Sequence, residues 1–472
     1  MNIKRVFAAA FAVAVTVQGA IVGPSAASYT TVLPYENYIY SETDGTAIRC
    51  PQAYVPDAVI SGEGLGITDF NNASDFDVDN NYCVYILDSS NQRIVVLNSD
   101  LQLKQLIALT ESATLNDAKG ITVTDDKIYI CDTENSRIII LNKDDGSLVK
   151  IIGAPQSSVL GEDFIFKPAK IAVDDNNDLY VVSGGTYEGI VNLSCDGDFI
   201  GFFSGNAVTT SSWDLFWRRF SSVKQKKSML QLVPQDFSSI DLDDEGFFYI
   251  TTYTTVNNSM VKRVNPGGNN IIRTLSNIPV SGDPYKIQNG SMAGLSSFGD
   301  IAAGPDKIYA CLDVTRNRVF CYNNDGYLLY TLGTYSSQLG GFEKPTAVCY
   351  IKDRIAVLDS KGGFITVFSP TEYGRLINSG IHLQNNLDYD KATEEWKRVL
   401  SMNSNYPLAL NMIGKAAYYE EDYEYAMACF KECDNRDMYS KSREALRSQW
   451  IYGNIKIILA VLLFLIAAAA VS

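Results

Sequence analysis

Short clusters of carboxylate side chains recur along this chain of 472 residues, and they are the groups best suited to bind a hard cation. Ca²⁺ prefers oxygen ligands from Asp, Glu and Asn. The clusters are Asp77-Val-Asp79, Asp125-Asp126, Asp174–Asp178 and Asp241–Glu245. Each lies between two short β-rich runs, whereas the ligands of one ion must converge from different loops. Because Asx and Gly residues favour tight turns, we interpret the clusters as turns, with a calcium site as the alternative.

Histidine is nearly absent, which restricts the other chemistry open to the chain. His382 is the only one, and it lies in a segment with helical periodicity. A Ser-His-Asp triad needs a histidine beside its nucleophile, and a multi-histidine metal site needs several. The β-rich part that precedes His382 therefore holds neither arrangement. We expect His382 itself to be a partly exposed helix residue.

One basic, aromatic segment at about 207–235 stands out in an otherwise acidic chain. Ser212 is placed to cap a helix that carries Trp213, Phe216, Trp217 and Phe220 on one stripe. Such a helix either packs its aromatic side chains over the rest of the fold, or docks an acidic partner or anionic lipid headgroups. The candidate interaction residues are Trp213, Trp217, Arg218, Arg219, Lys226 and Lys227.

The elements that position these groups are repeated. Asp88-Ser-Ser-Asn91-Gln-Arg93 recurs 44 residues later as Asp132-Thr-Glu-Asn135-Ser-Arg137, and a weaker copy begins at Asp313. Six turn-rich clusters follow one another at spacings of 45 to 69 residues. A four-stranded propeller blade needs about 40–45 residues, so the pattern predicts a six-bladed β-propeller with two insertions. We expect residues 36–60, ahead of the first repeat, to supply a strand that closes the ring.

The repeats resemble the NHL-repeat family of propellers over residues 55–370, through their Asp-x-x-Asn-x-Arg turns and the β-rich strands that follow. The resemblance implies that Asp and Arg tie a hairpin within each blade, so these residues are scaffold, and it names no reaction. The residues concerned are Asp88, Asn91, Arg93, Asp132, Asn135, Arg137, Asp313 and Arg318. The lactonases of the gluconolactonase class are six-bladed propellers too, with an axial divalent cation, and they supply the alternative function.

After the propeller, residues 373–450 change to helical periodicity. Two units align at a spacing of 34 residues, which resembles the tetratricopeptide repeat. In that family small residues let paired helices cross closely while an aromatic side chain fills the groove. The matching positions are Gly380, Ala392, Trp396, Gly414, Ala426 and Phe430. We expect a further helix at about 438–450.

Both ends of the chain carry membrane signals. Lys4-Arg5 precede an apolar run, Val6–Val17, and Pro24–Ala27 offers a signal-peptidase site. The run Ile457–Val471 predicts one transmembrane helix. The expected organisation is a signal peptide at 1–27, the propeller at 28–371, tetratricopeptide-like repeats at 372–450 and a transmembrane helix at 451–472.

The net charge and the cysteine content exclude two further classes of protein. The 39 basic and 54 acidic residues give a net charge of −15, which disfavours nucleic acid. The nine cysteines do not form a disulfide framework. One pair remains a candidate, because Cys311 and Cys321 are equidistant from Arg316, at the centre of a predicted hairpin.

Together these features predict an exported, non-catalytic protein held at the cell membrane with its propeller on the extracytoplasmic side. Its expected role is that of a binding or scaffold protein, as an accessory or sensor subunit of a membrane complex. Protein partners would dock on the propeller face or the helical repeats, and no cofactor is required. The alternative is a divalent-cation-dependent hydrolase of the lactonase type, with calcium as the candidate ion.

Overall fold

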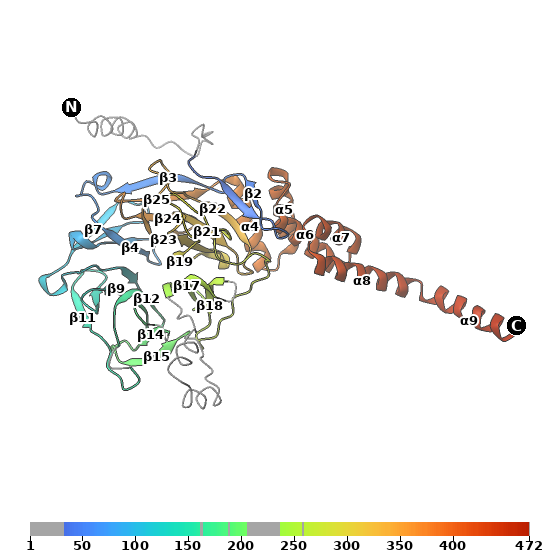
Figure 1. The fold of residues 1–472 in the computed structure, drawn as a ribbon, viewed down its shortest axis with the longest axis horizontal. Helices are drawn as coiled ribbons and strands as arrows, with labels where there is room; N and C mark the ends of the chain where they lie inside the picture. Colours follow the sequence, from blue (N-terminus) through green and yellow to red (C-terminus); the bar gives the residue numbers. More distant parts are fainter. Residues whose placement is uncertain (1–32, 161–163, 187–188, 205–236, 257–258, 472) are drawn as a thin grey trace. The chain divides into compact units, whose positions relative to one another are not determined.

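The computed structural model describes residues 33–160, 164–186, 189–204, 237–256 and 259–471. Residues Pro34–Ser472 form one compact unit. This unit is a mainly β six-bladed propeller followed by a C-terminal helical region (Figure 1). The candidate interaction residues of the 207–235 segment lie outside the described residues.

Six antiparallel sheets make up the propeller. From the first to the last strand in each sheet, blades one to three contain β4 (Ala73–Val78), β5 (Val84–Asp88), β6 (Arg93–Leu97) and β7 (Leu103–Ala108); β8 (Gly120–Val123), β9 (Lys127–Asp132), β10 (Arg137–Asn142) and β11 (Leu148–Ile152); and β12 (Pro168–Val173), β13 (Leu179–Ser183), β14 (Ile190–Leu193) and β15 (Phe199–Phe203).

Blades four to six contain β16 (Phe237–Leu242), β17 (Phe248–Val256) and β18 (Ser259–Val264); β19 (Phe298–Ala303), β20 (Tyr309–Asp313), β21 (Arg318–Tyr322) and β22 (Leu328–Leu332); and β23 (Pro345–Ile351), β24 (Arg354–Asp359), β25 (Phe364–Pro370) and β3 (Tyr54–Ser61). Short 3-10 helices are η1 (Glu63–Leu65), η2 (Ser89–Asn91), η3 (Glu111–Ala113) and η4 (Pro305–Lys307). The first strands β4, β8, β12, β16, β19 and β23 contact one another in a closed ring, so they line the axis.

The second strand of each blade is buried on both faces because a blade lies between two neighbours. In β5, Ile86 belongs to the same core cluster as Leu358 of the sixth blade. The next residue, Leu87, belongs to a cluster with Ile130 of the second blade. Successive side chains of a strand point to opposite faces, so a run of β-branched and aliphatic residues supplies the cores on both sides.

The N-terminal strand β3 completes the sixth blade, as the repeats predicted. It pairs antiparallel with β25, with Val59 opposite Thr366. The earlier part of the expected donor behaves differently. Residues Asn37–Tyr40 form β1, which pairs with β2 (Ala47–Cys50) as a separate hairpin and contacts β22 of the fifth blade.

The helical region contains α4 (Glu372–Asn385), α5 (Tyr389–Met402), α6 (Pro407–Tyr419), α7 (Tyr423–Glu432), α8 (Arg436–Gly453) and α9 (Ile455–Val471). Side chains of Thr371, Asp388, Asp422 and Asn435 accept a backbone N–H at the start of α4, α5, α7 and α8. These caps satisfy donors that have no partner inside the helix.

The helices pair through glycine and aromatic contacts. A Cβ added to Gly380 would lie 2.8 Å from Trp396, and one added to Gly414 would lie 2.9 Å from Phe430. Both aromatic side chains are fully buried, and so are Ala392 and Ala426 on the same helices. The glycines therefore allow α4 to approach α5, and α6 to approach α7, more closely than a larger residue would.

The helical region is packed directly on the propeller. The hydroxyl of Tyr330 in β22 donates to Asn378 of α4 at 3.0 Å, and Asn378 donates to Tyr54 of β3 at 2.9 Å. The hydroxyl of Tyr406, a fully buried side chain, donates to the backbone carbonyl of Leu329 at 3.1 Å. Blade and helices thus share one buried interface.

Within the described part of the chain, no single helix is both long enough and apolar enough to cross a membrane. The segments 436–453 and 455–466 meet that test only as a pair, bent by 65°. Helix α9 has 17 residues, which span about 25 Å, against a hydrocarbon thickness of about 30 Å. The single span expected at Ile457–Val471 is therefore not confirmed.

All nine cysteines are free thiols, so the Cys311–Cys321 disulfide is wrong. In the β20–β21 hairpin Cys311 lies opposite Phe320, and Cys321 lies opposite Ala310. The hairpin is centred half a residue away from Arg316. Because side chains alternate along a strand, this offset turns the two sulfur atoms to opposite faces of the blade.

Candidate functional site

A buried ionic cluster lies on the propeller axis. Asp75, Lys170, Ser239 and Asp300 hold equivalent positions in the first strands of four blades. The Lys170 ammonium lies 2.7 Å from Asp75 and 2.8 Å from Asp300. The Ser239 hydroxyl donates to Asp300 at 2.7 Å. One ammonium thus bridges carboxylates from two blades that are not neighbours.

The protonation of this cluster reflects its burial. Asp75 and Asp300 are each 3% exposed. Burial raises the pKa of Asp75 to about 7, although Lys170 opposes the shift. Burial alone would lower the pKa of the Lys170 amine, but the attraction of Asp300 and Asp75 outweighs it and holds that pKa above its usual range.

A second layer of polar groups lies two positions further along the first strands, at Asp77 of β4, Thr122 of β8, Asp241 of β16 and Cys349 of β23. Asp77 accepts hydrogen bonds from the Thr122 hydroxyl at 3.1 Å and the Val123 amide at 2.8 Å. Burial raises the pKa of Asp77, and burial together with Asp77 raises that of Asp241 to about 7.

The axial carboxylates also join neighbouring blades. Asp75 accepts the backbone N–H of Ile121, Asp241 that of Ala303, and Asp300 that of Val348. In each case the donor belongs to the first strand of the next blade. Among the described residues, no group of three or more Asp, Glu, His or Cys side chains is arranged to hold a metal ion. The Lys170 ammonium occupies the position between carboxylates that a cation would take.

The acidic clusters of the sequence divide into two kinds. Asp79, Asp174 and Asp243 each accept two backbone N–H groups within their own turn, which matches their interpretation as turns. Asp77 and Asp241 correct that interpretation, because they still belong to β4 and β16 and bond the next blade. The sequence did not lead to a predicted role for Asp75, Lys170 or Asp300. The available signal was a polar residue recurring at one position of otherwise apolar first strands.

The repeat motif forms the same tie in the first two blades. Arg93 Nε donates to Asp88 at 2.7 Å, and Asn91 donates to the same carboxylate oxygen at 2.8 Å. In the second blade, Arg137 and Asn135 bond Asp132 at 2.7 and 2.8 Å. The guanidinium groups also donate to backbone carbonyls of the preceding loop, so the tie joins that loop to the blade.

The fifth blade replaces this tie. Asp313 accepts the backbone N–H groups of Thr315 and Arg316, while Arg318 donates to the carbonyl of Gly333. Arg316 is 1% exposed and pairs instead with Asp283 at 3.0 Å. The motif has the same length in this blade, but Arg316 stands at the position of Asn91 and Asn135, so a different arginine lies in the interior. The pairing implied for Asp313 and Arg318 is therefore corrected.

His382 lies at the interface between the propeller and the helices. Its Nδ1 is 2.7 Å from a carboxylate oxygen of Asp306 in η4, and its Nε2 is 3.1 Å from the Asn386 side chain. The side chain is 55% exposed. These contacts fix the turn after α4 against the propeller.

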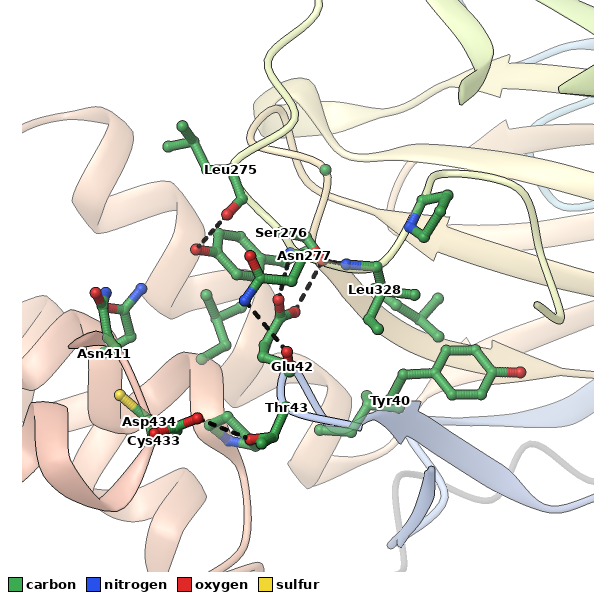
Figure 2. A pocket seen from close by; sticks show the side chains of 18 of the residues that line it. Tyr40, Glu42, Thr43, Leu275, Ser276, Asn277, Leu328, Asn411, Cys433 and Asp434 are labelled. Atoms are coloured by element: carbon green, nitrogen blue, oxygen red, sulfur yellow. Dashed lines mark hydrogen bonds between the residues drawn. The ribbon is translucent and has the colours of Figure 1, made fainter. Parts of the chain in front are cut away.

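A groove of about 520 Å³ lies where the propeller meets the helical region. Five segments line it: the β1–β2 turn with Glu42, the loop 275–279, the turn 326–328 of the fifth blade, the start of α6, and the α7–α8 turn. Figure 2 shows side chains from all these segments facing one space. The groove is thus built from parts of the chain that are remote in sequence.

The polar groups of the groove are held in place by hydrogen bonds. The Glu42 carboxylate accepts the Ser276 hydroxyl at 2.8 Å and the Asn277 amide at 2.6 Å (Figure 2). Burial raises the pKa of Glu42, although these two donors oppose the shift. Opposite them, the Thr43 hydroxyl donates to Asp434 at 3.3 Å, and the Asn435 amide donates to Asn411 at 2.8 Å. The groove is therefore a preformed site of carboxylates, amides and hydroxyls.

No protein-family model matches the chain, and the search of curated proteins returns no match. Among solved structures, virginiamycin B lyase from Staphylococcus aureus is similar over 67% of this chain and 99% of its own, with 13% identity and a TM-score of 0.40. Hydrazine synthase of Kuenenia stuttgartiensis is similar over 64% of this chain and 97% of its own, with 11% identity and a TM-score of 0.38. A Bacteroides thetaiotaomicron protein of unknown function is similar over 70% of this chain and 78% of its own, with 14% identity and a TM-score of 0.42. Likenesses at these TM-scores carry no argument about what this chain does.

Proposed function

We propose that the protein is a non-catalytic binding protein tethered to a membrane, with its propeller on the extracytoplasmic side and the groove as its ligand site. The observation that carries the proposal is the exposure of apolar side chains along α9. Leu463 is 66% exposed, Phe464 73% and Leu465 60%. An exposed apolar surface of this kind marks a contact with a membrane or a partner.

The attachment of the helical region supports a platform role. Because α4 and α6 are hydrogen-bonded to β22 and β3 through buried side chains, the groove keeps its shape without a ligand. Rigid sites lose less free energy on binding than sites that must order first. The mixed carboxylate and amide lining suits an extended segment of a partner polypeptide, which presents backbone N–H groups and polar side chains.

The finer resemblances fit this proposal. The Gly–aromatic contacts of Gly380 with Trp396 and of Gly414 with Phe430 support tetratricopeptide-like pairing of α4 to α7. The Asp–Arg ties of the first two blades support an NHL-like propeller. In both resemblances the shared residues stabilise the fold. We therefore assign the selection of the ligand to the groove.

Membrane attachment is tested by charging α9. The double substitution Leu463→Lys with Phe464→Lys introduces two ammonium groups into the exposed apolar helix, which costs about 2.5–3.5 kcal/mol each at the centre of a membrane helix. We expect the variant to move from the carbonate-resistant membrane fraction to the soluble fraction. Val149→Lys, at a 52% exposed site on β11, is the control and should stay in the membrane fraction. Wild-type protein that is extracted by carbonate would overturn the tether.

The groove is tested by photocrosslinking in intact membranes. A photoreactive residue at the exposed Asn277 should yield a discrete adduct with a partner polypeptide, whereas the same residue at Asp144, in a turn of the second blade, should not. Equal yields at both positions would show that the groove does not select a partner. Protease access to the propeller in sealed vesicles of known orientation tests the side of the membrane.

A further inference from the structure

Exposed basic side chains lie along α8 and at the start of α9 in a strongly acidic protein. Between Met438 and Lys456 there are four basic residues, Lys441, Arg443, Arg447 and Lys456, against the single acid Glu444. This gives a local charge of +3, while the whole chain has −15. All four basic side chains are exposed, and none forms an ion pair with a described residue.

The two halves of α8 have different surroundings. In the first half, Met438 and Tyr439 pack against the core cluster of α7 that includes Phe430, and Ser442 is fully buried. From Arg443 onwards, most side chains of α8 are exposed. Arg443, Arg447 and Trp450 are spaced i, i+4, i+7, so they lie on one face of the helix. We call these three residues the basic stripe.

The basic stripe leads directly into α9. Trp450 is 62% exposed and Tyr452 is 77% exposed. Aromatic residues of this kind are enriched where a protein passes from water into lipid. The bend of 65° between α8 and Ile455–Ile466 would let one helix enter a bilayer while the other lies along its surface. The basic residues, the exposed aromatic residues and the bend therefore all lie near the junction of α8 and α9.

We propose that the basic stripe docks on an anionic membrane surface, with Arg443, Arg447 and Lys456 contacting lipid phosphates and Trp450 at the headgroup level. The inference rests on the proposed membrane attachment through α9 and adds the class of lipid that the protein selects. Basic residues next to an apolar helix are attracted to anionic lipids within about a Debye length of the surface. The continuity of the stripe with α9 favours a lipid surface over an acidic protein segment.

Hydrogen exchange of the full-length protein in nanodiscs tests this docking. Amides in residues 443–453 should exchange more slowly in discs containing phosphatidylglycerol than in discs of phosphatidylcholine alone, and high salt should remove the difference. The double substitution Arg443→Gln with Arg447→Gln should reduce this lipid-dependent protection about 25-fold, which corresponds to about five-fold for each basic residue removed. The matched control is Lys397→Gln with Arg398→Gln on exposed positions of α5, which removes the same charge and should leave the protection unchanged.

The outcomes separate the two proposals. Equal exchange of residues 443–453 in both kinds of disc would overturn docking on anionic lipid and leave the basic stripe to an acidic protein segment. Equal loss of protection in both double variants would overturn it too, because the effect would then follow net charge and not the stripe. Failure of the wild-type protein to enter discs of either composition would overturn the tether itself, and the docking with it.

Discussion

At the scale of single residues, the axis of the propeller depends on one lysine. Lys170 lies within 2.8 Å of two carboxylates from different blades, and those carboxylates also accept backbone N–H groups of the following blades. A buried ion pair of this kind adds little free energy relative to an apolar replacement, but the loss of one partner leaves an uncompensated charge. Lys170 therefore matters for stability chiefly because its removal would leave buried carboxylates without a counter-charge.

Lys170→Met should destabilise the fold by about 3–5 kcal/mol at pH 8, because Asp75 and Asp300 lose their counter-ion. Burial already raises the pKa of Asp75 to about 7 from an ordinary value of 3.8, and loss of the ammonium raises it further. A carboxyl with a raised folded pKa takes up a proton in the folded state first, so stability falls as pH rises through this interval. The loss measured by urea unfolding should therefore be smaller at pH 5 than at pH 8.

The matched control is Lys150→Met. Lys150 lies 2.7 Å from Asp196, as close as Lys170 is to Asp75, but the pair is exposed at the surface. Its loss should cost about 0–1 kcal/mol. Equal losses for the two variants, or a Lys170→Met loss that grows toward acid pH, would contradict the assigned charge pairing.

At the scale of elements, the repeats allowed the six sheets and the closing strand to be predicted. A sheet buried on both faces needs apolar residues at successive positions, and such runs between turns are visible in one sequence. The ionic cluster of Asp75, Lys170 and Asp300 was not predicted, because these residues meet only when three blades are set in a ring. Nor was the groove, since Thr43 and Asp434 are separated by 391 positions. Local patterns indicate elements, whereas these contacts depend on how the elements assemble.

The helix pairs provide a test at this scale. Gly414→Leu should destabilise the protein by about 1–3 kcal/mol through overpacking, because a Cβ at this position already lies 2.9 Å from Phe430 and 3.1 Å from Cys429. Gly453→Leu makes the same substitution in α8, where no atom lies within 4 Å of an added Cβ, and should cost nothing. The measurement is the free energy of urea unfolding of the full-length protein. A neutral Gly414→Leu variant would show that α6 and α7 are not closely paired.

At the scale of the whole molecule, the propeller and the helical region form one compact unit, and a groove of about 520 Å³ lies where they meet. The same six-bladed ring would also suit a cation-dependent hydrolase, and the two functions differ in what the axis must hold. A hydrolase needs ligands from several blades left free to bind an ion. In this chain the carboxylates of four first-strand positions are bonded to Lys170, to a neighbouring blade, or to both.

Calcium should therefore leave the thermal stability of the protein unchanged. An ion bound only by the folded state, at a hundred times its dissociation constant, adds about 2.7 kcal/mol of stability, which is several degrees in melting temperature for a chain of this size. Because the Lys170 ammonium lies between Asp75 and Asp300, a second cation at that position would be repelled. The measurement compares melting temperatures in millimolar calcium and in chelator for the wild type and for Asp77→Asn with Asp241→Asn, which removes the second axial layer. A calcium-dependent rise of several degrees in the wild type that disappears in this variant would place an ion on the axis and favour the hydrolase. A rise that persists would place the ion elsewhere.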